Sequence, residues 1–233
     1  MSHVKNLQAF GKLIGHCTGY GGAYNPGQQN LQVNALATLL NNAQQKIHDV
    51  QVAAIAYDHA VNDRAERTDE VVARAGRVLN LLKAMNLPAA TLADARALVR
   101  SLRATVAAAP EPETSPEATP AGRRARGGDY GTRIARFAKL VAFVETLAYQ
   151  PNEPELALQG LRQTLAALQQ AHDRVNTAYV ALNNARLERD KVMYQGPFSV
   201  VRTALAVKRY VQGVYGTVSS QYRDVSPLRF TMR

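Results

Sequence analysis

Tryptophan is absent from this 233-residue chain, and cysteine occurs once, as Cys17. One cysteine cannot form an intrachain disulfide, so a disulfide-stapled fold is excluded and a reducing, cytoplasmic location is expected. No stretch approaches the ~20 consecutive apolar residues of a membrane span. Residues 1–5 lead into a short amphipathic segment and not into an apolar secretory core. The sequence therefore favours a protein with no membrane span.

The residue patterns of common catalytic and metal sites are missing as well. Asp58 and His59 are sequence neighbours, so on a helix they project about 100° apart and form a poor catalytic dyad. The histidines show no metal-ligand spacing with acidic residues or with Cys17. We therefore expect no enzyme, no cofactor, no metal and no small-molecule substrate.

What the sequence does contain is a second copy of its own first half. At an offset of 125 residues, Tyr24-Asn25-Pro26 corresponds to Tyr149-Gln150-Pro151. The same offset pairs identical residues at Leu31/Leu156, Leu36/Leu161, Leu40/Leu165, Gln44/Gln169, Gln45/Gln170, Val50/Val175, Ala53/Ala178, Ala56/Ala181, Ala60/Ala185 and Arg64/Arg189.

The offset changes only at turn-like sequences. It is 127 upstream, where Phe10 pairs with Phe137, and 129 downstream, where Val71 pairs with Val200. The changes fall at Gly21-Gly22 and within 194–197, where insertions are tolerated because the entropy of loop closure grows slowly with length. This pattern indicates a tandem duplication of residues 5–103 and 132–230.

Each copy is predicted to contain one long helix, over Gln28–Arg67 and Pro154–Met193. Apolar residues recur at alternating steps of three and four in both runs, which is the helical period, with polar residues between them. Shorter helices are expected before and after each long one. Thr68, Thr91 and Ser219-Ser220 are candidate N-caps for the helices that follow them.

Between the copies the composition changes. Residues 104–131 carry four prolines and few bulky apolar side chains, which is typical of a semi-extended linker. We therefore predict three segments: helical repeat 1 (1–103), a linker rich in alanine, proline and glycine (104–131) and helical repeat 2 (132–233). Arg123, Arg124 and Arg126 within the linker are interpreted as solvated residues.

The predicted fold is all-α, an elongated pseudo-twofold helical bundle with two long central helices and shorter flanking helices. A long amphipathic helix must bury its apolar stripe against partners of similar length, so the two copies are expected to pack on each other. The alternative is two separate small bundles joined by the linker.

The charge is unevenly distributed between the copies. The chain has 28 basic and 18 acidic residues, a net charge of +10. Residues 132–233 hold 14 basic and seven acidic residues, so this half carries +7. A basic balance permits attraction to nucleic acid or to an anionic surface without requiring it.

Cations and aromatic rings interleave near the end of the chain. Such a mixture could neutralise phosphates and stack on bases. Alternatively, the tyrosines pack on a neighbouring helix with their hydroxyls at its edge, which we consider the better interpretation. The candidate contact residues are Arg202, Lys208, Arg209, Tyr210, Tyr215, Tyr222, Arg223 and Arg229.

Several short sequences in the second half carry a family resemblance. They are Phe137-Ala138-Lys139-Leu140-Val141, Tyr149-x-Pro151-Asn152-Glu153 and Tyr210-Val211-Gln212-Gly213-Val214-Tyr215-Gly216, the last running on to Gln221-Tyr222. In these short sequences the chain resembles a family of uncharacterised, internally duplicated all-helical bacterial proteins. The resemblance implies a duplicated helical fold and implies no particular activity.

Two functional hypotheses follow. The first is a non-catalytic structural or protein-interaction bundle, whose partner is another protein or a second copy of the chain. The second is a nucleic-acid or polyanion-binding protein that uses the basic second repeat. Loss of nucleic-acid binding with rising salt would distinguish the second from the first.

Overall fold

The computed structural model describes residues 2–104 and 130–232. This part of the chain is all-α, with no strand. The predicted linker lies outside the described residues, except for its two ends. The elements are α1 (Ser2–Gly19), η1 (Gly21–Ala23), η2 (Gln29–Leu31), α2 (Val33–Ala84), α3 (Ala89–Arg103), α4 (Tyr130–Glu145), α5 (Leu158–Tyr194), α6 (Val200–Tyr215) and α7 (Ser220–Val225).

The chain divides into two compact units, and each unit combines both halves of the sequence. Unit 1 consists of residues 1–57 and 178–233, and unit 2 of residues 58–177. The boundaries of the units therefore differ from those of the sequence repeats. The long helices α2 and α5 each contribute one part to unit 1 and the other part to unit 2.

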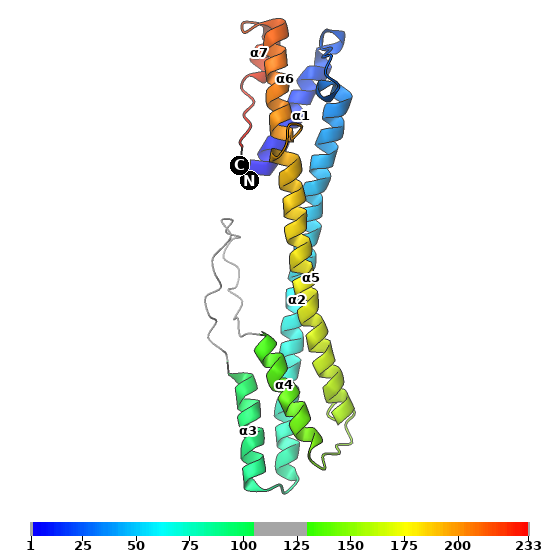
Figure 1. Ribbon diagram of the computed structural model, residues 1–233, viewed down its shortest axis with the longest axis vertical. Helices are drawn as coiled ribbons and strands as arrows, with labels where there is room; N and C mark the ends of the chain where they lie inside the picture. The colour runs from blue at the N-terminus through cyan, green and yellow to red at the C-terminus, as the bar shows by residue number, and fades with distance from the viewer. Residues whose placement is uncertain (1, 105–129, 233) are drawn as a thin grey trace. The chain divides into compact units, whose positions relative to one another are not determined.

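In unit 1, α1, α6 and α7 pack with the first part of α2 and the last part of α5 (Figure 1). Its core contains Phe10 and Leu13 from α1, and Val207 from α6, all fully buried. Leu36 on α2 and Met193 on α5 are fully buried in the same core. Because these side chains come from distant parts of the sequence, unit 1 requires both the start and the end of the chain.

Unit 2 has the complementary composition. Here α3 and α4 pack with the last part of α2 and with the first part of α5 (Figure 1). Its fully buried residues include Leu82 on α2, Phe137 and Leu140 on α4, and Leu161 on α5. Each unit therefore has a hydrophobic core of its own.

The first long helix does not end where the sequence suggested. Thr68, predicted to cap a new helix, lies inside α2, and its Oγ1 donates a hydrogen bond of 2.8 Å to the Arg64 carbonyl. Threonine is tolerated within a helix when its hydroxyl bonds to the preceding turn in this way. The predicted break in the second copy is present, because α5 ends at Tyr194 and Gly196 adopts a left-handed φ of 77°.

The other two predicted caps have different outcomes. Thr91 lies inside α3, which begins at Ala89 after Pro88, so this cap prediction is wrong. Pro88 stands at the N-cap position of α3, with no side-chain hydrogen bond that caps the helix. The Ser219 prediction is confirmed, since its hydroxyl accepts a hydrogen bond of 3.1 Å from the Tyr222 N–H at the start of α7.

No helix in the described ranges combines the length and the apolar composition that crossing a membrane requires.

Candidate functional site

The predicted basic and aromatic residues all belong to unit 1, on α6, on α7 and in the segment that follows α7. Four arginines among them are exposed to solvent, Arg202 and Arg209 on α6, Arg223 on α7 and Arg229 beyond it. Because these four guanidinium groups reach solvent, they are available to an anionic partner.

The tyrosines of the predicted site pack against the unit 1 core. Tyr210 and Tyr215 are half-buried, and their rings meet Tyr24 and Tyr20 at centroid distances of 5.5 and 5.8 Å in edge-to-face geometry. Tyr222 also contacts this core. Edge-to-face pairs stabilise a core beyond the area that they bury. The rings are thus packing elements of unit 1, and two of them meet the tyrosines that flank η1.

Lys208 holds the end of the chain in place. Its Nζ donates hydrogen bonds to the carbonyl oxygens of Ser226 (2.9 Å) and Leu228 (2.8 Å). Burial lowers the pKa of Lys208. Since an ammonium group has three donor hydrogens and two are engaged here, Lys208 is less available to an external anion than the exposed arginines are.

The segment after α7 is also tied to α1. The buried Asn6 side chain donates to the Thr231 carbonyl at 2.9 Å and accepts from the Thr231 N–H at 3.0 Å. These paired bonds fix the chain end against the first helix. Sequence reasoning missed them, because the two residues are 225 positions apart.

A shallow groove of about 470 Å³ lies beside α6 in unit 1, which we call the unit 1 groove. One wall is the segment that includes η2, and the other is α6. The Tyr24 hydroxyl donates to the Leu31 carbonyl at 2.8 Å and so closes that segment on itself. The lining residues are Pro26, Gly27, Gln28, Leu31, Ala206, Arg209 and Tyr210.

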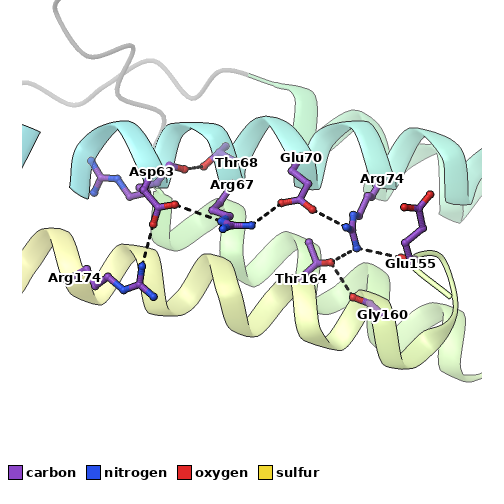
Figure 2. Close-up of polar contacts among 10 residues, drawn as sticks. Asp63, Arg67, Thr68, Glu70, Arg74, Glu155, Gly160, Thr164 and Arg174 are labelled. Atoms are coloured by element: carbon purple, nitrogen blue, oxygen red, sulfur yellow. Dashed lines mark hydrogen bonds and ion pairs between the residues drawn. The ribbon is translucent and has the colours of Figure 1, made fainter. Parts of the chain in front are cut away.

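Unit 2 contains a ladder of alternating charges that runs along α2 and reaches α5 through one ion pair (Figure 2). Asp63 pairs with Arg174 at 3.3 Å and with Arg67 at 3.4 Å. Arg67 pairs with Glu70 at 3.3 Å, and Glu70 pairs with Arg74 at 2.6 Å. Each partly exposed pair contributes only about 0–1 kcal/mol. Only the Asp63–Arg174 pair joins α2 to α5, so the ion pairs of the ladder add little stability to the contact between the two helices.

The ladder ends at a second shallow cavity, of about 290 Å³. Arg74 donates to the Thr164 hydroxyl at 2.6 Å and to the Glu155 carbonyl at 3.2 Å. Thr164 Oγ1 in turn donates to the Gly160 carbonyl at 2.8 Å (Figure 2). Because the positive groups here already have partners, this cavity offers no free charge to a ligand.

Gly160 allows the chain before α5 to approach the helix. A Cβ at this position would lie 2.3 Å from the Pro154 carbonyl oxygen and 2.9 Å from the Glu155 backbone. We expect Gly160→Ala to lower the free energy of unfolding by about 1–3 kcal/mol, because backbone atoms must move. Urea unfolding measures this loss.

Gly15→Ala on α1 is the matched control, since nothing lies within 4 Å of its added Cβ. Removing a helical glycine there is expected to raise the free energy of unfolding by about 0.5–1 kcal/mol. Equal effects of the two substitutions would show that the close approach at Gly160 does not constrain the fold.

Cys17 is fully buried in the unit 1 core. Burial raises the pKa of its thiol to about 11. The thiolate is the reactive form of cysteine, so Cys17 is an inert packing residue at neutral pH. Burial likewise raises the pKa of the neighbouring Tyr20 to about 12.

The described residues bring no three histidine, cysteine, aspartate or glutamate side chains together in a way that could hold a metal ion. The structure thus collects the predicted cations in one unit, but turns most of the aromatic rings inward.

No family model matches the chain, and neither the curated proteins nor the solved structures provide a match.

Proposed function

We propose that the chain is a non-catalytic helical bundle, built by tandem duplication, that works through protein–protein contacts. The observation that carries this proposal is a set of large apolar side chains left exposed on the long helices within unit 1. Ile55 on α2, and Val180 and Leu187 on α5, are exposed to 57%, 56% and 63%. Burying an aliphatic side chain of this size contributes roughly 1.5–3 kcal/mol.

Burial at equivalent positions supports the duplication and its pseudo-twofold relation. Residues that the sequence alignment pairs are buried alike, although they belong to different units. The pairs are Phe10/Phe137, Leu13/Leu140, Tyr24/Tyr149, Leu31/Leu156, Leu36/Leu161, Val71/Val200, Ala75/Ala204, Val78/Val207 and Leu82/Val211. Common ancestry with the internally duplicated helical family would produce the same pattern. We therefore also propose that the chain shares ancestry with that family.

One pair of exposed apolar positions follows the same equivalence. Ile55 and Val180 are separated by the offset of 125 residues that relates the two copies. A surface that repeats within one chain is suited to contact with a second copy of that chain, because symmetric assemblies pair like surfaces. We therefore take self-association as the first interaction to test.

The test uses the double variant Ile55→Ser/Val180→Ser and light scattering over a wide range of protein concentrations. The wild-type chain is expected to increase in mass with concentration, and the variant is expected to remain monomeric. Val4→Ser/Val218→Ser is the control, because Val4 and Val218 are exposed to 52% and 79% but lie outside the long helices. A monomeric wild-type chain at every concentration would overturn self-association as the function.

The charge of unit 1 favours a second candidate function, polyanion binding. Residues 1–57 and 178–233 hold twelve basic and four acidic residues, a difference of +8, whereas unit 2 holds sixteen basic and fourteen acidic residues, a difference of +2. Unit 1 therefore accounts for most of the net charge of +10. Titrating salt against binding of mixed DNA and RNA tests this candidate, since phosphate contacts weaken steeply with salt.

A further inference from the structure

Two exposed arginines of α6 form a positive stripe with no acidic partner. Arg202 and Arg209 are seven residues apart, so they lie on the same face of α6, separated by about 10 Å along its axis. Within residues 2–104 and 130–232, no carboxylate lies within ion-pair distance of either group. In unit 2, by contrast, Arg77 and Arg162 pair with Glu155 and Glu145.

The segment facing α6 lacks two carboxylates that its counterpart in unit 2 carries. The duplication aligns Gln28 and Asn30 with Glu153 and Glu155. In unit 2 the second of these carboxylates pairs with Arg77, whose aligned residue in unit 1 is Ala206. In unit 1 both positions carry neutral amides, so Arg209 keeps its charge unopposed at the edge of the unit 1 groove. Arg209 itself aligns with Asn80, so the positive charge beside the groove belongs to unit 1 alone.

The groove beside Arg209 supplies an apolar surface next to that charge. Leu31 and Ala206 line it together with the half-buried Tyr210 ring. Its walls are fixed, because Tyr24 bonds to the Leu31 carbonyl and packs edge-to-face on Tyr210. A ligand that fits both the arginine stripe and the groove carries repeated negative charges. It also has flat, partly apolar groups that can be buried in the groove.

Single-stranded nucleic acid has this combination of properties. Its phosphates can contact the two guanidinium groups, and an unstacked base can rest on the apolar wall. In a duplex the flat faces of the bases are stacked inside, and only the base edges and the phosphates are available. An acidic peptide supplies the negative charge but lacks flat bases for the groove.

We propose that the Arg202–Arg209 stripe and the unit 1 groove bind single-stranded nucleic acid. The phosphates lie along α6, and one base occupies the groove between Gln28 and Tyr210. This proposal rests on polyanion binding as the second candidate function, and it assigns that function to one place on unit 1.

The test measures binding of the full chain to a fluorescent single-stranded oligonucleotide by anisotropy, at a series of salt concentrations. Arg202→Gln/Arg209→Gln removes both charges of the stripe. The log–log salt slope is expected to fall by about 1.4, at roughly 0.7 for each phosphate that the variant no longer neutralises. Gln28→Glu, which introduces the acid found at the equivalent position in unit 2, is expected to weaken binding at low salt.

Arg96→Gln/Arg100→Gln on α3 is the matched control, because it removes two exposed positive charges from unit 2. It is expected to leave the salt slope unchanged. Circular dichroism of every variant shows whether the helices remain intact. Equal effects of the two arginine pairs would overturn the assignment to α6 while leaving polyanion binding by the protein in place.

Competitors identify the ligand class. Unlabelled single strands are expected to displace the probe well below the concentration at which duplex DNA or polyglutamate does. Equal competition by duplex DNA would show that the site binds phosphates in general, and this would contradict base binding in the groove. Equal competition by polyglutamate would contradict nucleic acid as the ligand. No binding of the oligonucleotide by the wild-type chain at low salt would overturn both the site and the second candidate function.

Discussion

Phe10→Ala is expected to lower the free energy of unfolding of unit 1 by about 3–5 kcal/mol. Phe10 is fully buried and packs in a core that also contains Leu13 and Cys17 from its own helix and Val207 from α6. Truncation removes the apolar surface that the ring buries and leaves a cavity, because close-packed neighbours relax only in part. Unfolding in urea, followed by the helical signal, measures the loss.

Phe198→Ala is the control for this change, because the Phe198 ring is 64% exposed. It is expected to change the free energy of unfolding by less than about 0.5 kcal/mol. Hydrogen exchange locates the effect of Phe10→Ala, and the amides of unit 1 should lose the most protection. If the two alanine variants were equally stable, the assignment of Phe10 to the unit 1 core would be wrong.

The apolar periodicity of the sequence predicted most of the helices. The expected shorter helices are present except the one predicted to begin at Thr68, which is part of α2. On α4, for example, Phe137, Leu140 and Val144 recur on one helical face and are buried. The break after Tyr194 could also be read, because glycine and proline follow it directly. Fold class and approximate helix positions thus come from local patterns.

The continuity of α2 through Thr68 was harder to predict from local patterns. Threonine is both a good N-cap and an acceptable helix-interior residue, and the choice depends on whether its hydroxyl bonds forwards or backwards. The sequence from Arg64 to Ala75 contains no glycine or proline, which was the available signal against a break.

Long-range pairing could not be predicted from sequence periodicity. Arg74 and Thr164 meet in the unit 2 ladder although 90 residues separate them. Packing of Tyr210 on a neighbouring helix was the preferred interpretation, but its ring contact with Tyr24 could not be named in advance. Periodicity assigns a residue to a helix face, but it does not show which distant element covers that face.

Each compact unit contains residues from both halves of the chain. Separating the halves is therefore expected to have the second large effect, a loss of folding in each half. When residues 1–104 and 130–233 are expressed as separate chains, each lacks half of every core. The first chain alone leaves Phe10, Leu13 and Leu36 without their partners from α5 and α6. Exposing each such side chain costs roughly 1.5–3 kcal/mol, so these three alone offset much of the roughly 5–15 kcal/mol that typically stabilises a folded protein.

The most direct measurement is therefore co-purification of these two halves, with circular dichroism of each half alone and of the pair. We expect each half alone to show reduced helicity and no cooperative unfolding as a monomer. The co-expressed halves should form a one-to-one complex with the helicity of the intact chain. Two halves that each fold as stable monomers and do not associate would contradict a structure in which both units are shared between the halves.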